Sequence, residues 1–229
     1  DAVNPPIHAW ATLRVHQVER RVWGARDDDF LERVFHKLLL NFTWWANRVD
    51  ADNRNVFGGG FLGLDNIGVL DRSAPLPGGM HLHQSDGTAW MGFFALSMLA
   101  IALELAQGGA AVRPAYDGLA SKFFEYFLYI ADALGHRKLA LYDELEQFYF
   151  DAVHACDGGA PRRIRLRSLV GEVPLFGVYV LEPRVLQRLP DFARRLQWFV
   201  AHRPDLTERN VASLRREGAQ HRLLLSMLS

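Results

Sequence analysis

One long apolar helix constrains the fold of this chain more than any other sequence feature. Between about Asp86 and Ala106, apolar residues occupy nearly every side of a helical pattern. We expect Ser85 or Asp86 to cap its start and Gly108-Gly109 to end it. The most apolar part carries Glu104 and is shorter than a membrane span, which favours a buried core helix. Other helices must therefore cover it on most sides.

Amphipathic helices are predicted on both sides of this core helix. Their apolar residues recur at a spacing of three to four, and the triplet Asp27-Asp28-Asp29 places negative charge where a helix start favours it. Another helix is indicated around Leu169–Leu181, and the tail from Asp205 gives no clear prediction. The amphipathic segments are 7–23, 30–50, 114–134 and 189–202.

A single small β-hairpin is predicted in the second half of the chain. Residues 148–153 form a short strand pattern, residues 155–161 form a turn, and residues 164–167 alternate as its partner. Weak helix-loop-helix repetition suggests an α/α solenoid or toroid, with 86–106 as an inner helix and 30–48 and 114–134 as outer helices. The predicted class is mainly α with one small hairpin.

Composition excludes several kinds of protein. The formal net charge is zero, which argues against a general nucleic-acid surface. Cys156 is the single cysteine, so no internal disulfide can form. No signal peptide or membrane span is visible, and we expect a cytoplasmic protein without membrane partners. Because the first residue is Asp1 and not Met, we expect the chain to be a piece of a longer protein.

A glycine-rich segment, residues 57–72, surrounds the carboxylate of Asp65 between two helical patterns. Glycines permit close approach of backbone to a ligand, and a long loop of this kind is usually functional. The sequence from Gln84 to Trp90 then places a second carboxylate, Asp86, at the start of the core helix. We interpret the two segments as one side of a sugar-processing site. The alternative is that Asp65 only caps a turn.

Three residues after this segment are candidates for substrate binding. The helix dipole favours ionised Asp86, which suits hydrogen bonds to sugar hydroxyls or to a positive neighbour, although a plain N-cap is equally compatible. Gln84 can reach hydroxyls or lie in a solvated loop. Trp90 can stack on a pyranose ring, whereas Trp45 is assigned to the core.

Several motifs in order resemble a known family. These are NVFGGGFLGLDNIGVLDRS, QSDGTAWM and SKFFEYFLYIADA, together with NPPIHAWATLRV and RIRLRSLVGEVPLF. They resemble the bacterial branch of glycoside hydrolase family 63, which contains processing α-glucosidases and mannosylglycerate hydrolases. The resemblance implies an (α/α)6 toroid that hydrolyses α-glycosidic bonds with inversion, using one carboxylic acid and one carboxylate.

The resemblance assigns roles to particular residues. Asp65 takes the place of the general acid, and Asn66 beside it is expected to contact the carbohydrate substrate. The sequence departs from the family at Phe61 and Leu62, and Arg72 lies three places after the usual arginine. No segment resembles the one that carries the general base, since Glu172 and Glu182 stand in a different context. Residues 1–229 are therefore expected to form one partial toroid domain, inactive without the rest of the parent catalytic domain.

Metal ligands are weakly indicated. His81 and His83 have a spacing that can bind metal, but no third ligand is apparent, so exposed loop histidines are the preferred interpretation. Residues 50–55 alternate carboxylate and amide oxygens as calcium loops do, but Arg54 occupies a ligand position. We expect no cofactor, with calcium as the less favoured alternative.

Two other function classes stay open. A helical interaction module would present a smooth groove remote from Asp65, whereas a glycosidase would gather carboxylates and aromatic residues around one cleft. Another toroid enzyme, such as a sugar epimerase or polysaccharide lyase, would present a basic cluster of Tyr, His and Arg around a cavity.

Overall fold

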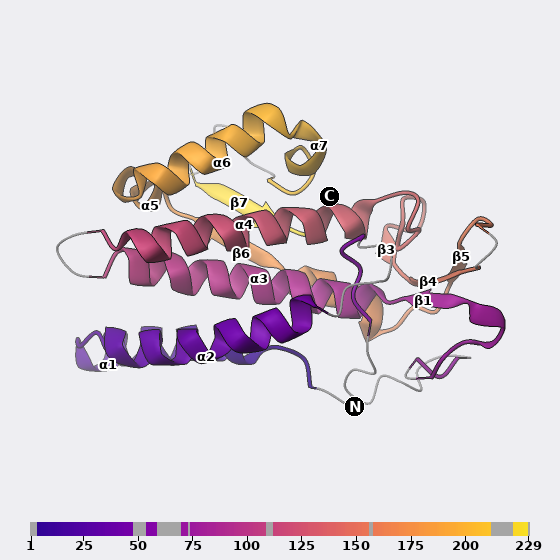
Figure 1. Ribbon diagram of the computed structural model, residues 1–229, viewed down its shortest axis with the longest axis horizontal. Coiled ribbons are helices and arrows are strands. Elements are labelled where there is room, and N and C mark those ends of the chain that lie inside the picture. Colours follow the sequence, from indigo (N-terminus) through magenta and orange to yellow (C-terminus); the bar gives the residue numbers. More distant parts are fainter. Residues whose placement is uncertain are drawn as a thin grey trace.

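The protein is mainly helical with a few small antiparallel sheets, which confirms the mainly α part of the predicted class. The computed structural model describes residues 4–47, 54–58, 70–72, 74–108, 112–155, 158–211 and 222–228. In Figure 1 the helices lie in layers, with α1 and α2 on one side, α3 and α4 in the middle, and α5, α6 and α7 on the other side.

Helix α3 (Ser85–Ala106) is the core helix that the sequence predicts. All its residues are buried except Phe93 and Glu104. It is long and apolar enough to cross a membrane, but 89% of its most apolar stretch is buried inside the protein. A Cβ atom at Gly92 would lie 2.2 Å from Sδ of Met227, so a larger residue there would displace the methionine side chain. The other elements are built around this helix.

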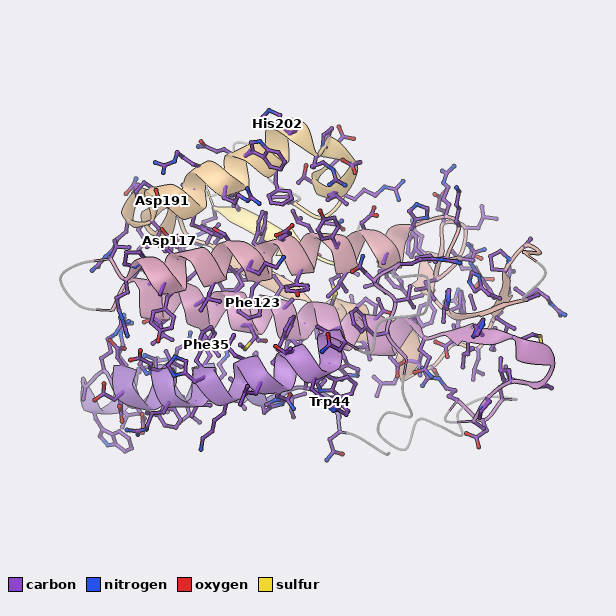
Figure 2. All side chains as sticks on the ribbon, in the orientation of Figure 1. Phe35, Trp44, Asp117, Phe123, Asp191 and His202 are labelled. Atoms are coloured by element: carbon purple, nitrogen blue, oxygen red, sulfur yellow. The ribbon has the colours of Figure 1, made fainter. Side chains whose placement is uncertain are left out.

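Helices α1 (His8–Trp23), α2 (Asp28–Ala46) and α4 (Pro114–Gly135) cover α3, as predicted. Asp27 caps α2 by accepting a hydrogen bond from the Phe30 amide at 2.8 Å. The rings of Phe35 on α2 and Phe123 on α4 meet edge to face, with centroids 6.1 Å apart (Figure 2). Aromatic residues thus connect the outer helices to one core.

Helices α5 (Pro183–Arg188), α6 (Pro190–His202) and α7 (Pro204–Thr207) form the third layer. Phe192 and Phe199 of α6 are buried, with ring centroids 6.0 and 5.8 Å from that of Phe124 on α4. This contact buries Phe124 of α4, and α6 confirms the helix predicted over 189–202.

The described residues contain three small sheets, so the expectation of a single hairpin was wrong. Strand β4 (Asp151–His154) lies between β1 (His81–His83) and β5 (Arg162–Ile164), with Asp151 opposite Ile164. The β4–β5 pair is the predicted hairpin. Strand β1 was not predicted, because its three residues lie inside a segment that reads as a loop in the sequence. Strands β2 (Tyr142–Asp143) and β3 (Phe148–Tyr149) form a second pair.

The helix predicted over 169–181 was right only for its first part, as a 3-10 helix, and wrong for its second part. A 3-10 helix covers Leu169–Phe176, and strand β6 (Val178–Leu181) follows it and pairs with β7 (Leu223–Ser226). Pro174 cannot donate a backbone hydrogen bond, and the β-branched Val178 and Val180 favour a strand. The partner strand lies more than forty positions later, beyond the reach of any local pattern. A further 3-10 helix, η1, covers Pro77–Gly79.

Helix α1 leaves apolar side chains exposed, including Val18 and Trp23. We therefore expect the isolated chain to self-associate, with a mass by light scattering that rises with concentration. The variant Val18→Glu/Trp23→Glu is expected to restore a monomer. A matched control, Leu145→Glu, changes an exposed leucine of the β2–β3 turn and should leave the association unchanged. A monomer at every concentration would contradict this expectation.

Candidate functional site

The two flanks of the glycine-rich segment meet at the first turn of α3. On one side, the Phe57 amide donates to Oγ1 of Thr88 at 3.1 Å. On the other side, Nε2 of Gln84 donates to the backbone carbonyl of Arg72 at 3.0 Å. Residues 59–69 lie outside the described residues, and so do the predicted acid Asp65 and its neighbour Asn66. The segment that carries them is thus anchored at both ends to the helix start.

A buried arginine joins two carboxylates at this point. Arg72 binds both carboxylate oxygens of Asp86, one of them from Nη1 at 3.1 Å. Its Nε lies 2.8 Å from Oδ2 of Asp151 on β4. All three side chains are buried, so water does not screen their charges. A buried cation between two carboxylates connects the glycine-rich segment, helix α3 and the β1–β4–β5 sheet.

Asp151 also completes the start of α3. Its Oδ1 accepts a hydrogen bond from the Ser85 amide at 2.9 Å, and the Ser85 hydroxyl lies 3.3 Å from the same oxygen. The N-cap residue is Gln84, whose side chain makes no capping bond. The expectation that Ser85 or Asp86 would cap the helix was wrong, because a carboxylate from a distant strand supplies the acceptor.

Burial and charge act in opposite directions in this cluster. Burial raises the pKa of the Asp151 carboxyl, the charge of Arg72 lowers it, and Asp86 raises it, with a net increase. Burial by itself would lower the pKa of Arg72, but the hydrogen bond and charge of Asp86, together with Asp151, raise it overall. Arg72 therefore stays charged and holds the two carboxylates in place.

The predicted binding residues on α3 are packed inside the protein. Gln84 is buried and bonded to Arg72, so it is not a solvated loop residue. Asp86 has a positive neighbour, which was one of the two predictions for it, and Arg72 donates to both of its carboxylate oxygens. Trp90 is buried against Phe93 and Phe176, and its indole N–H finds no acceptor within the described part of the chain. Direct contact of these residues with a substrate stays a prediction.

The assignment of Trp45 to the core is confirmed, since the residue is 3% exposed. The histidines of β1 differ from the expectation of exposed loop residues. His81 is exposed, but His83 is buried and its ring centroid lies 3.9 Å from that of His154 on the neighbouring strand. Over the described ranges, no three His, Cys, Asp or Glu side chains gather as metal ligands would. The calcium pattern falls mostly on residues 50–53, outside those ranges.

The predicted site residues included neither Asp151 nor Arg72. Asp151 lies between Phe150 and Ala152 in an apolar strand pattern, where a carboxylate needs a partner. That signal could have marked it as a buried polar residue. No local pattern could have identified Arg72 as the partner, because 79 positions separate the two residues in the numbering.

Comparison with known proteins yields one informative relative. The chain is 47% identical over 241 aligned residues to the uncharacterized protein YMR196W of Saccharomyces cerevisiae. The alignment covers 99% of this chain and 22% of the yeast protein, so the chain spans about a fifth of that relative's length. No protein-family model matches the chain, and no solved structure matches it. The chain is thus similar to one part of a much longer yeast protein.

Proposed function

We propose that this chain is part of an inverting glycoside hydrolase that cleaves α-glycosidic bonds, as α-glucosidases do. Asp65 acts as the general acid that protonates the departing sugar oxygen. Asn66, Gln84, Asp86 and Trp90 form the adjoining wall of the substrate site. The general base lies in another part of the longer catalytic domain.

The observation that carries this proposal is the double anchoring of the glycine-rich segment on α3. Phe57 and Arg72 flank the segment, and both are bonded to residues of the helix start. Catalytic groups need positioning to within a fraction of an ångström, and buried charge pairs provide rigid supports. The bonds of Phe57 and Arg72 thus fix the two described flanks on either side of the proposed acid.

The partial (α/α)6 toroid belongs to the same proposal. Helix α3 is buried on nearly all sides, as an inner helix would be, whereas α2 and α4 have one exposed face, as outer helices would. A ring of this kind needs more helices than the described part of the chain contains. The yeast relative is long enough to supply them, because the aligned part is 22% of its length. We also propose a cytoplasmic location and a carbohydrate as the partner of the site.

The test is an assay of the full-length protein on a panel of α-glucosides and mannosylglycerate. We expect hydrolysis of at least one compound, with the β-anomer as the first product seen by proton NMR, because inversion changes the configuration at the anomeric carbon. An α-anomer as the first product would contradict the inverting mechanism. No hydrolysis of any compound in the panel would contradict the proposed substrate class.

A second candidate function is a helical interaction module. A groove of about 340 Å³ lies between α1, α3 and β6, lined by apolar side chains such as Trp10, Phe93 and Phe176. It contains neither Gln84 nor Asp86, and an apolar groove of this kind is suited to a partner helix. Hydrolysis of a glycoside by the full-length protein would favour the glycoside hydrolase over the interaction module.

The epimerase or lyase alternative has a weaker basis. A pocket at the far end of α3 does gather arginines around Tyr179. However, burial raises the pKa of the Tyr179 hydroxyl to about 12, with further increases from Glu104 and Glu182. A general base works best with a pKa near the operating pH, so this tyrosine is poorly suited to proton abstraction.

A further inference from the structure

Strand β6 has a partner strand on one edge only, within the described part of the chain. It pairs with β7, and no described strand lies on its other side. Two of its residues, Val178 and Val180, are each 44% exposed. Proteins commonly protect a free edge with a charged residue or a proline, and Val178–Leu181 contains neither. The edge is therefore suited to accept a further strand.

The ladder shows which backbone groups of β6 face away from β7. The Gly177 carbonyl accepts from the Met227 amide at 3.0 Å, so these two residues lie at a hydrogen-bonded position. Such positions alternate along an antiparallel pair, which places Tyr179 and Leu181 at the next two. The amides and carbonyls of the two valines between them therefore point outward.

The bonds of β7 agree with this alternation. The Ser226 amide, opposite Val178, donates to the Asn210 carbonyl at 2.9 Å and so points away from β6. From the other described segments, no hydrogen bond reaches the outward groups of Val178 and Val180. Two donors and two acceptors are thus open to a strand on this side.

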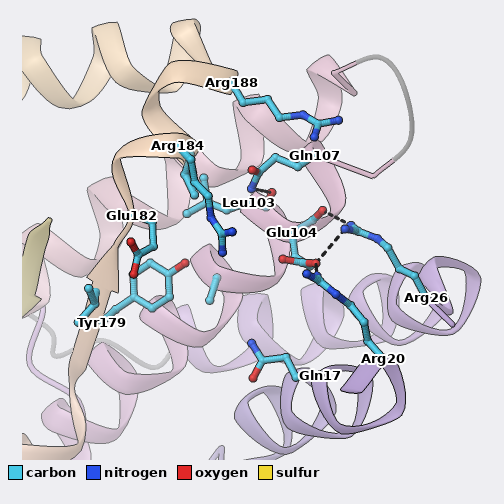
Figure 3. Close-up of a pocket in the computed structure, with 13 residues that line it drawn as sticks. Gln17, Arg20, Arg26, Leu103, Glu104, Gln107, Tyr179, Glu182, Arg184 and Arg188 are labelled. Atoms are coloured by element: carbon cyan, nitrogen blue, oxygen red, sulfur yellow. Dashed lines mark hydrogen bonds and ion pairs between the residues drawn. The ribbon is translucent and has the colours of Figure 1, made fainter. Parts of the chain in front are cut away.

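The open edge of β6 lines the apolar groove of about 340 Å³, whose other lining residues come mainly from α1 and α3. Gln17 and Tyr179 also line a second pocket, of about 410 Å³, so the groove continues toward Arg184 (Figure 3). The two pockets together follow the chain from Val178 to Glu182. The space is therefore at least as long as the strand.

The apolar groove contains one charged side chain. Trp10 and Phe176 supply apolar surface and are 45% and 47% exposed. Arg14 lies over the Trp10 ring and donates to Gln17 at 2.8 Å. It forms no ion pair with the described residues. A partner with apolar residues and one carboxylate would complement this lining.

We propose that the groove holds a β-strand from another part of the longer protein, which extends the β6–β7 sheet to three strands. The aligned part is 22% of the yeast relative, so a protein of that length has most of its chain elsewhere. A helix would fill the same space, but its backbone groups are bonded within the helix and would leave those of Val178 and Val180 without partners. A strand satisfies them. The proposal does not depend on glycosidase activity.

The test is hydrogen exchange of the full-length protein, resolved at single residues by mass spectrometry with electron-transfer fragmentation. We expect all four β6 amides to exchange at least about a hundredfold more slowly than in an unstructured peptide, because β7 bonds two and the added strand bonds two. A free edge, or a helix in the groove, would leave Val178 and Val180 fast while Tyr179 and Leu181 stay slow. That alternation would overturn the proposal.

The variant Val178→Lys/Val180→Lys places lysines on the edge, where they disfavour pairing with a further strand. We expect these two amides to exchange at least about tenfold faster, while Tyr179 and Leu181 stay slow because their bonds go to β7. Unchanged protection of the two substituted positions would overturn the proposal. If the lysines disrupt the β6–β7 pair itself, Tyr179 and Leu181 also lose protection, and the wild-type pattern decides.

The matched control is Val15→Lys/Val22→Lys, which changes two exposed valines of α1 that do not line the groove. All four β6 amides should stay protected in this variant. Equal acceleration in both double variants would show that added charge loosens β6 from any position, and would overturn the proposal.

Discussion

Replacing Arg72 by methionine is expected to lower the free energy of unfolding by about 3–5 kcal/mol, because it leaves two buried carboxylates without their cation. Methionine has a similar length and fills the same space. Arg72 contacts both oxygens of Asp86 and one oxygen of Asp151, and all three residues are buried. Urea denaturation followed by circular dichroism measures the loss.

Two variants separate a charge effect from a general loss of packing. Arg137 is 78% exposed and pairs with exposed Glu144, so Arg137→Met should cost no more than about 1 kcal/mol. The triple variant Arg72→Met/Asp86→Asn/Asp151→Asn removes the unpaired charges and should recover part of the stability lost in Arg72→Met. If the triple variant is less stable than Arg72→Met, unpaired buried charges are not the cause of the stability lost in Arg72→Met.

The cost of Arg72→Met should also depend on pH. Burial raises the pKa of folded Asp151 and Arg72 lowers it, so removing Arg72 raises it further. A carboxyl whose folded pKa exceeds its unfolded value near 4 destabilises the fold as pH rises through the folded pKa. The difference between wild type and variant should therefore be smallest near pH 4 and grow toward neutrality. Urea titrations at several pH values measure this trend.

Replacing Asp65 by asparagine is expected to lower kcat/KM of the full-length protein on α-glucosides by a hundredfold or more. A general acid typically contributes about 10²–10⁴-fold, because the departing oxygen otherwise leaves as an unprotonated alkoxide. The loss should be largest for natural sugars, whose leaving groups are poor. Unchanged turnover would eliminate Asp65 as the acid.

A substrate with a good leaving group distinguishes proton donation from a damaged site. Fluoride departs without a full proton transfer, so Asp65→Asn should retain most of its activity on α-glucosyl fluoride while losing activity on natural α-glucosides. Asp71→Asn makes the same change at an exposed position within the same segment and should stay within about twofold of wild type. Equal losses on both substrates would indicate a structural role for Asp65.

Most helices could be predicted from the sequence because each depends on a local period. Helix α3 begins one residue before its predicted start and ends at the predicted residue, since its apolar pattern and the following glycine lie within one segment. The inner face of α4 likewise follows a local spacing, with Phe123, Phe124 and Phe127 buried. The helix predicted at 169–181 failed because Val178–Leu181 is stabilised as a strand by Leu223–Ser226, a partner that local reasoning does not reach.

The sequence by itself thus determined a buried apolar helix, the amphipathic helices around it and the glycine-rich segment before it. Only the tertiary structure decided that Arg72 and Asp151 meet at the start of α3, and that Arg184 faces the other end. The physical reason is distance along the chain. Periodicity reports which side of one element avoids water, whereas charge pairing between distant segments depends on how the elements pack.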